Sequence, residues 1–155
     1  VLNDDDKMPW NLNPRLGGEK LEQHAYEFKR KSKEIEQFEG LALVEQLCEK
    51  VSKRFDCSVF AVTCNRFQDP DHMIDWHRDT YGTHIFVLSL GSQRKVQFRK
   101  KGSRTDIETL RPAAGEIYFM PLQLNKTHKH RVCPAENNGQ SDIPRISLVF
   151  FVRFY

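Results

Sequence analysis

Short runs of β-branched and aromatic residues make up most of the chain after Asp56, and turn-forming residues separate one run from the next. Such runs are typical of β-strands, because branched and aromatic side chains pack well on a pleated surface. Many short strands behind a helical front predict a β-sandwich or barrel of the jelly-roll kind. The expected strands cover residues 58–64, 84–90, 95–99, 106–110, 116–120 and 145–154.

The region before these strands has the composition of helices. Residues 19–53 are rich in Glu, Lys, Gln and Leu, and apolar residues recur near helical spacing. Two helices fit, with a division near Gly40. The second has an apolar stripe that suits the cover of a sheet, made of Leu41, Val44, Leu47, Cys48 and Val51. We therefore expect an α+β fold, with N-terminal helices packed on one sheet of a double-stranded β-helix (jelly-roll) core.

The length of 155 residues suits a single domain with its own core. No apolar stretch approaches the roughly 18 residues that a membrane-spanning helix needs, so we expect a soluble protein, and we expect a monomer. Residues 4–7, Asp-Asp-Asp-Lys, resemble the remnant of a removable expression tag. We accordingly treat residues 1–7 as a possible tag remnant or disordered start, and residues 8–155 as the domain.

The cysteines predict a reducing environment. None of Cys48, Cys57, Cys64 and Cys133 has CxxC spacing, and no apolar signal peptide precedes them. Free thiols are typical of intracellular proteins, so we expect a cytoplasmic or nuclear location.

The net charge of +3 is modest, but Lys and Arg gather in residues 29–33, 94–104 and 126–131. Such clusters suit a polyanionic partner such as nucleic acid. Clusters of this kind also occur on ordinary solvent-exposed surfaces without a binding function, and this explanation is equally good. Charge alone therefore does not identify a partner.

His77-Arg78-Asp79 forms an H-x-D triplet. Side chains two positions apart in an extended segment project to the same face, so an imidazole and a carboxylate converge there. A third donor from a distant strand would complete the two-histidine, one-carboxylate arrangement of non-haem Fe(II) oxygenases, which leaves positions open for a co-substrate and O₂. Alone, the triplet is a weak signal, because a surface His beside an Asp is the commoner explanation.

The downstream segment His128-Lys129-His130 supplies two candidates for the third donor, and spacing does not choose between them. Arg145 begins the last expected strand, where its guanidinium could bind a dicarboxylate bidentately. Structural zinc fits less well, because such sites are normally closed by four ligands.

Further motifs follow in a fixed order. Residues 65–79 begin with Asn65-Arg66-Phe67 and end with the H-x-D triplet. After them come Ser89-Leu90-Gly91, residues 115–120 (Gly-Glu-Ile-Tyr-Phe-Met), residues 130–134 (His-Arg-Val-Cys-Pro) and residues 145–150 (Arg-Ile-Ser-Leu-Val-Phe). Together these motifs, which span residues 65–153, resemble the AlkB family of nucleic-acid dealkylases.

The resemblance implies a metal centre of His77, Asp79 and His130 that holds Fe(II), with 2-oxoglutarate and O₂ as co-substrates. It implies a 2-oxoglutarate site made of Asn65, Phe67, Arg145, Ser147 and Arg153. Conversion of 2-oxoglutarate to succinate and CO₂ would be coupled to hydroxylation of an N-alkyl group on a DNA or RNA base, with release of formaldehyde, as in DNA repair. The base would come from a single strand or be flipped out of a duplex.

Several positions depart from the family pattern. Phe67 stands where the family has a tyrosine, so one hydroxyl is missing, and Ser147 replaces an asparagine. The second family arginine is replaced by Phe151, and Arg153 lies two residues further on. Thr80 stands where one branch of the family has an Asp that contacts the base, which puts demethylation of cationic bases such as 1-methyladenine in doubt.

The residues around the triplet are the candidates for substrate binding, namely Trp76, Arg78, Thr80 and Tyr81. Trp76 is equally well explained as a core aromatic, and Tyr81-Gly82 as a turn. Two other functions stay open: a 2-oxoglutarate-dependent hydroxylase or demethylase of a protein or small molecule, and a non-catalytic module that binds nucleic acid or protein.

Overall fold

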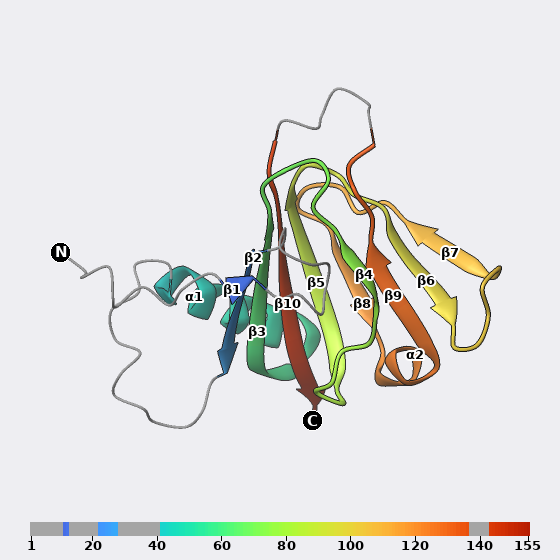
Figure 1. Ribbon diagram of the computed structural model, residues 1–155. Coiled ribbons are helices and arrows are strands. Elements are labelled where there is room, and N and C mark those ends of the chain that lie inside the picture. Colours follow the sequence, from blue (N-terminus) through green and yellow to red (C-terminus); the bar gives the residue numbers. More distant parts are fainter. Residues whose placement is uncertain (1–10, 13–21, 28–40, 137–142) are drawn as a thin grey trace.

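Two antiparallel sheets form most of the fold (Figure 1). The computed structural model describes residues 11–12, 22–27, 41–136 and 143–155. The larger sheet has the order β1-β2-β3-β10-β5-β8 and the smaller sheet β4-β9-β6-β7. From β3 onward the chain passes repeatedly between the two sheets, and this confirms the expected jelly-roll order. The strands are β1 (Asn11–Leu12), β2 (Glu22–Glu27), β3 (Cys57–Phe67), β4 (Ile74–His77), β5 (His84–Gly91), β6 (Val96–Lys100), β7 (Ile107–Leu110), β8 (Ile117–Met120), β9 (His128–Val132) and β10 (Arg145–Phe154).

The main core lies between the two sheets. Phe67, Ile85 and Phe151 contribute to it from the larger sheet, while Val96 and Val132 contribute from the smaller one. These residues alternate with outward-facing positions along their strands, as the period of a strand requires. The two sheets thus present their inner faces to each other.

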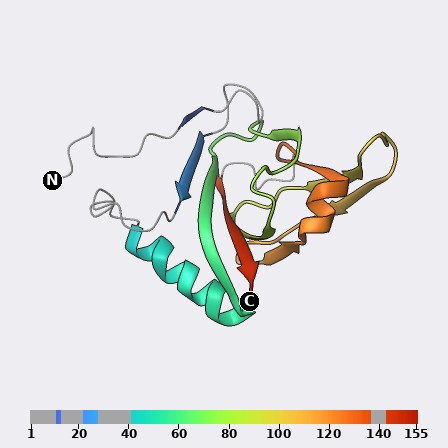
Figure 2. The ribbon, with the colours of Figure 1, turned by 90° about the horizontal axis from the view of Figure 1, so that it is seen from below.

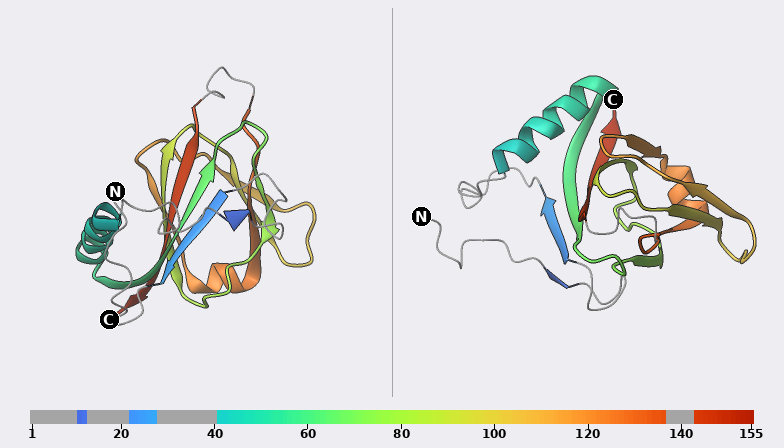
Figure 3. Two further views of the ribbon diagram at one scale, coloured as in Figure 1. Left: turned by 60° about the vertical axis from the view of Figure 1, so that its left-hand side comes forward. Right: turned by 90° about the horizontal axis from the view of Figure 1, so that it is seen from above.

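The second expected helix is present as α1 (Leu41–Phe55), and it covers the other face of the larger sheet (Figures 2 and 3). The predicted apolar stripe faces the sheet, since Cys48 and Val51 are buried in a second cluster with Phe86 and Phe150. Within the described residues, no helix is long and apolar enough to cross a membrane.

The first expected helix falls mostly outside the described residues, as does the suggested tag at residues 1–7. Where that helix region is described, at Glu22–Glu27, it is a strand and not a helix. This strand pairs antiparallel with β3, so backbone hydrogen bonding to a sheet edge overrides the helical composition of the segment.

The register of the larger sheet brings three separate motifs together. β10 lies between β3 and β5, and Arg145 is paired with Phe67 on one side and Gly91 on the other. Two residues further on, Ser147 is paired with Asn65 and with Ser89. Residues two apart on a strand share a face. The pairing of β10 with β3 and β5 therefore brings Arg145, Ser147 and their partners together at one end of the larger sheet.

The sequence did not predict β9 or the short helix α2 (Leu122–Thr127) before it. β9 reads His-Lys-His-Arg-Val and lacks an apolar alternation, because His130 occupies a position that faces the inside. The four cysteines, all within the described residues, are free thiols, as expected.

Candidate metal centre and cavity

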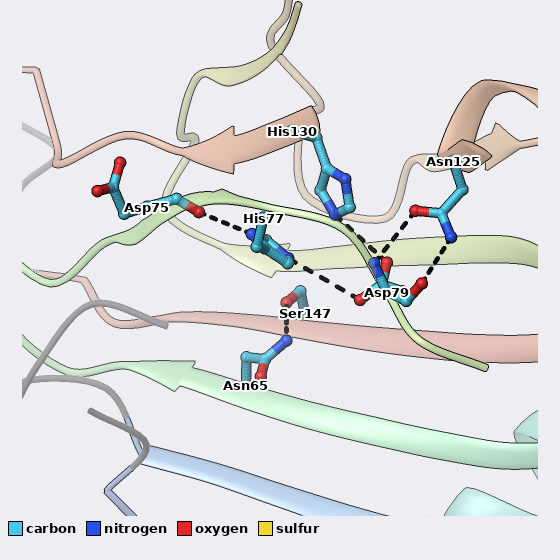
Figure 4. A network of polar contacts seen from close by, with 7 residues as sticks. All are labelled: Asn65, Asp75, His77, Asp79, Asn125, His130 and Ser147. Atoms are coloured by element: carbon cyan, nitrogen blue, oxygen red, sulfur yellow. Dashed lines mark hydrogen bonds and ion pairs between the residues drawn. The ribbon is translucent and has the colours of Figure 1, made fainter. Parts of the chain in front are cut away.

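Three donor side chains meet on the inner face of the smaller sheet. His77 ends β4 and is paired with His130 of β9, and Asp79 lies two residues beyond His77. Figure 4 shows the two imidazoles and the carboxylate directed toward one another. The possible ligand atoms of these residues all lie within 4.8 Å of one another. His130 Nε2 is 3.3 Å from Asp79 Oδ2, and His77 Nε2 is 3.9 Å from Asp79 Oδ1.

The structure distinguishes His130 from its neighbour His128. Both lie on β9, but only His130 belongs to the cluster with His77 and Asp79. His128 interacts instead through Nδ1 with the Thr127 hydroxyl at 2.8 Å.

A register shift in β4 directs His77 inward. Ile74 is paired with Val132, and His77 with His130, so β4 has one residue more than β9 over the same interval. An extra residue of this kind changes the direction of the side chains that follow. Ile74 and His77 therefore both point inward, although strict alternation would put them on opposite faces.

The pKa shifts of His77 and Asp79 suit a divalent metal. Burial, followed by the charge of His130, lowers the pKa of His77 to about 4, so the imidazole is neutral near pH 7. Burial alone would raise the pKa of Asp79, but chiefly the hydrogen bond from His130 brings it below its usual value. A neutral imidazole and an ionised carboxylate are the forms that bind metals.

Backbone and amide groups fix the orientation of two of these side chains. His77 Nδ1 lies 2.7 Å from the Asp75 carbonyl oxygen, which can only accept, so Nδ1 carries the proton and Nε2 keeps its lone pair for a metal. The buried Asn125 side chain contacts both backbone polar groups of Asp79, accepting from its N–H at 3.1 Å and donating to its carbonyl at 2.8 Å.

A cavity of about 450 Å³ opens beside the cluster. Its volume lies within the range of small-molecule sites, about 300–1,000 Å³. The predicted residues Asn65, Arg78, Thr80, Tyr81 and Ser147 all line it. The remaining lining residues are the three donors of the cluster together with Thr63, Ile74, Val87, Tyr118, Met120, Val132, Val149 and Phe151.

Arg145 is a buried cation with unused donors. One of its nitrogens, Nη2, donates to the Ser89 hydroxyl at 3.1 Å, but Nε and Nη1 have no hydrogen-bond partner within the described part of the chain. Burial lowers the pKa of Arg145 to about 10, which leaves it charged at neutral pH. A buried guanidinium with free N–H groups fits a ligand carboxylate, because unpaired buried donors cost free energy that such a ligand recovers.

Tyr118 connects Arg145 with the cavity. Its side chain lines the cavity, whereas Arg145 does not. Burial raises the pKa of Tyr118 to about 12, while the nearby charge of Arg145 acts to lower it and that of Asp79 to raise it. The phenol therefore lies within electrostatic range of both Arg145 and Asp79.

Not every predicted residue reaches the cavity. Phe67 is fully buried, and its ring lies 4.9 Å from the Arg145 guanidinium. Arg153 is exposed and lies over the ring of Phe60, outside the cavity lining. Arg153 thus lies beyond the cavity, near the end of β10. The register shift after Phe151 adds a residue to β3 and not to β10, whose pairing with β5 stays regular through Val152.

Trp76 also lies outside the cavity, and it is not a core residue. It is half-buried, with Arg99 and Arg131 over its ring at 4.2 and 4.7 Å. The extra residue in β4 puts Trp76 on the outer face of the smaller sheet, opposite to His77.

Sequence reasoning did not single out Asn125, Tyr118 or Arg94. Alternate residues of the expected strand 116–120 share a face, so Tyr118 and Met120 could have been placed together. For Asn125, the sequence offers no such signal. Arg94 belongs to a basic run, yet it is fully buried and donates to the carbonyls of Asp69, Pro70 and His72, which fixes the segment before β4.

A second group of possible donors, Asp69, Asp71 and His72, is less suited to a metal. Both ring nitrogens of His72 are engaged: Nδ1 accepts from the Gln68 N–H at 3.1 Å, and Nε2 lies 3.0 Å from Asp69 Oδ2. His72 therefore has no free lone pair to offer.

Residues 57–154 match the family model described as the 2OG-Fe(II) oxygenase superfamily. No curated protein matches the chain. Among solved structures, the chain is similar to the Drosophila melanogaster CENP-C cupin domain, at 10% identity and a TM-score of 0.44, over 58% of this chain and 59% of that one. It is also similar to the capsular polysaccharide assembling protein CapF of Staphylococcus aureus, at 14% identity and a TM-score of 0.43, over 61% of this chain and 24% of that one.

Proposed function

The chain belongs to the 2OG-Fe(II) oxygenase superfamily, and we propose that it is an Fe(II)- and 2-oxoglutarate-dependent dioxygenase whose metal is held by His77, Asp79 and His130. The observation that carries the proposal is the convergence of these donors within 4.8 Å, on the wall of a cavity. Two imidazoles and one carboxylate on one side of an ion leave the opposite positions open, as oxygenase chemistry requires.

Iron, 2-oxoglutarate and O₂ together supply an oxidant that inserts one oxygen atom into a C–H bond, while 2-oxoglutarate becomes succinate and CO₂. The protein supplies the geometry. His77 and His130 bind through Nε2, and Asn125 holds the backbone of Asp79 so that its carboxylate faces the same point. Apolar side chains such as Val87, Met120 and Val149 line the cavity and limit the access of water.

Arg145 is the proposed partner of the distal carboxylate of 2-oxoglutarate. Among the residues that the structure describes, its Nε and Nη1 groups have no hydrogen-bond partner, and Ser89 orients the guanidinium through Nη2. Asn65 and Ser147, which are hydrogen-bonded to each other at 3.3 Å, offer further polar contacts on the cavity wall. We assign the Tyr118 hydroxyl to the same ligand, in place of the hydroxyl that is absent at Phe67.

For the substrate we propose an AlkB-like reaction, the oxidative demethylation of a DNA or RNA base. The ordered motifs from Asn65 to Arg153 support this choice, as do Arg78 and Tyr81, which provide a cation and an aromatic ring at the cavity. Hydroxylation of an N-methyl carbon gives an N-hydroxymethyl group, which splits into formaldehyde and the N–H base. Because Thr80 offers no carboxylate to a cationic base, neutral methylated bases belong among the candidates.

The test is turnover with Fe(II), 2-oxoglutarate and O₂ against methylated single-stranded DNA, methylated RNA and methylated peptides. Succinate reports on the oxygenase reaction, and formaldehyde identifies the substrate class. We expect succinate formation to disappear in His77→Ala and Asp79→Ala and to persist in His128→Ala, a matched control on the same strand as His130.

Undiminished turnover in His77→Ala would refute the assigned metal centre. Formaldehyde from peptides alone would favour the alternative of a protein demethylase on the same site. A protein that binds nucleic acid or protein but produces no succinate with any substrate would instead be a non-catalytic module.

A further inference from the structure

The outer face of the smaller sheet carries a cluster of cations around one indole. Trp76 of β4, Arg131 and Lys129 of β9, and Gln97 and Arg99 of β6 occupy this face, which we call the Arg–Trp face. The register pairs Gln97 with Arg131 and Arg99 with Lys129, so these side chains are neighbours across adjacent strands. Their strand neighbours His130 and Phe98 point to the opposite side, toward the core.

The arginines of this face are held in place. The guanidinium carbons of Arg99 and Arg131 lie 4.2 and 4.7 Å from the centre of the Trp76 ring, within the range of cation–π contacts. Arg131 Nε also donates to the Gln97 side-chain oxygen at 2.8 Å, and Gln97 Nε2 donates to the Thr109 hydroxyl at 3.2 Å. Because Nε is the group used, the two terminal nitrogens of Arg131 keep their N–H groups for a ligand.

The positive charge of this face has no carboxylate counter-charge among the described residues. Within the described residues, Arg99, Lys129 and Arg131 form no ion pair with a carboxylate. On β7, the residues paired with Arg99 and Gln97 are Ile107 and Thr109, which carry no charge. The last residue of β6 and the turn that follows it add the exposed cations Lys100, Lys101 and Arg104 and one acid, Asp106, so the surface remains basic.

The Arg–Trp face and the cavity lie on opposite sides of the same strands. Trp76 immediately precedes His77, and β4 is one of the two edge strands of the smaller sheet among the described residues. Directly after β4, Arg78, Thr80 and Tyr81 line the cavity. A flexible polymer that crosses β4 could therefore contact both sides.

We propose that the Arg–Trp face binds the phosphate backbone of a single-stranded nucleic acid, one nucleotide of which enters the cavity across β4. Guanidinium groups of fixed orientation match phosphate oxygens, and a single strand can bend around the edge of a sheet more easily than a duplex can. This inference rests on the proposed function, because it supplies the binding surface for the nucleic-acid substrate of the same cavity.

The test measures binding of a fluorescent, unmodified single-stranded oligonucleotide by anisotropy at several salt concentrations, without Fe(II) or 2-oxoglutarate. We expect the double variant Arg99→Gln/Arg131→Gln to bind at least about tenfold more weakly at low salt, and to reduce the slope of log K against log salt by about 0.7 for each phosphate that is no longer neutralised. Lys50→Gln/Lys53→Gln is the matched control, because it removes the same charge from exposed positions of α1.

A second measurement does not depend on arginine variants. Trp10 and Trp76 are the two tryptophans of the chain, so Trp10→Phe leaves Trp76 as the single indole reporter. We expect binding of the oligonucleotide to change the fluorescence of Trp76. The affinity obtained from this change should equal the affinity obtained from anisotropy.

Equal weakening in the arginine and lysine double variants would overturn the proposal, since it would show only a dependence on net charge. Binding of a duplex or of polyglutamate as tightly as the single strand would also overturn it. Because these measurements need no turnover, they remain decisive if the oxygenase proposal fails. Conversely, oxygenase activity on peptides without oligonucleotide binding would refute this inference and leave the metal centre standing.

Discussion

The side-chain amide of Asn125 makes two hydrogen bonds to the backbone of Asp79, accepting from its N–H at 3.1 Å and donating to its carbonyl at 2.8 Å. The two residues belong to segments far apart in the sequence, the helix α2 and the loop after β4. A paired amide of this kind fixes both the position and the direction of the Asp79 backbone. Asn125 thus positions a proposed metal ligand without contacting the metal itself.

Asn125→Ala should weaken metal binding, because the Asp79 loop is then without both constraints. Removal of a group that orients a metal ligand typically lowers affinity about 10- to 100-fold. Titration with Co(II), followed by its visible absorbance, measures this directly. Gln123→Ala, an exposed position on the same helix, is the control and should bind Co(II) like the unmodified protein. Equal affinities in both variants would show that the Asp79 loop is held by other contacts.

Gly91→Ala should destabilise the protein through one close approach. Gly91 has φ +77°, and a Cβ there would lie 2.0 Å from the Pro144 carbonyl oxygen, next to Arg145. The left-handed conformation alone costs about 1–2 kcal/mol for a residue with a side chain, and the clash adds to it. Gly102→Ala is the matched control, since φ there is +80° but nothing lies within 4 Å of the added atom. Urea unfolding should show the larger decrease in stability for Gly91→Ala; equal decreases would mean that Pro144 moves away freely.

The fold could largely be predicted because the strand signal is local. β10 has the predicted bounds, and α1 buries its predicted stripe, since both patterns record which side chains face the core. The segment at Glu22–Glu27 was predicted as a helix because its composition says nothing of the β3 edge with which it pairs. β9 escaped prediction for a related reason, because an inward-facing histidine replaces the apolar residue that alternation would require.

The candidate site was predictable only where residues carry recognisable chemistry. Side chains that commonly bind metals or carboxylates are recognisable in the sequence, as at His77, Asp79, His130 and Arg145. The strand pairing then brings the first three together. The direction of Trp76 was not predictable, because it depends on one extra residue in β4. The role of Asn125 depends on a tertiary contact that leaves no pattern in the sequence.

Stability of the metal-free protein should fall as the pH decreases from about 6.5 to about 4. The pKa of His77 is lowered to about 4 in the folded chain, chiefly by burial, from a value of 6.5. Between these values the unfolded chain binds more protons, so the free energy of unfolding decreases with decreasing pH, by at most about 1.4 kcal/mol per pH unit for one group. Urea unfolding in the presence of a chelator measures this. His77→Gln should have a flatter profile over the same range, and an unchanged profile would mean that His77 is not held neutral by the fold.

Replacement of Arg145 by methionine should separate stability from ligand binding. Arg145 is buried with two unpaired nitrogens, whereas Arg94 is equally buried but donates to three backbone carbonyls. Arg145→Met removes a buried charge that lacks a carboxylate partner, so the free energy of unfolding without ligand should stay the same or rise. Arg94→Met, the contrasting variant, should be destabilised by about 2 kcal/mol or more, because it leaves three carbonyls without their charged donor.

The effect of 2-oxoglutarate on the melting temperature should depend on Arg145. With a redox-inert metal bound, 2-oxoglutarate should raise the melting temperature of the unmodified protein, because a ligand that binds only the folded state stabilises it. Arg145→Met should abolish this increase, since the unpaired guanidinium is the proposed partner of the distal carboxylate. Tyr118→Phe, which removes one hydroxyl from the cavity wall, should keep part of it. If Arg145→Met keeps the full increase, or is destabilised as much as Arg94→Met, then Arg145 serves the fold rather than the co-substrate.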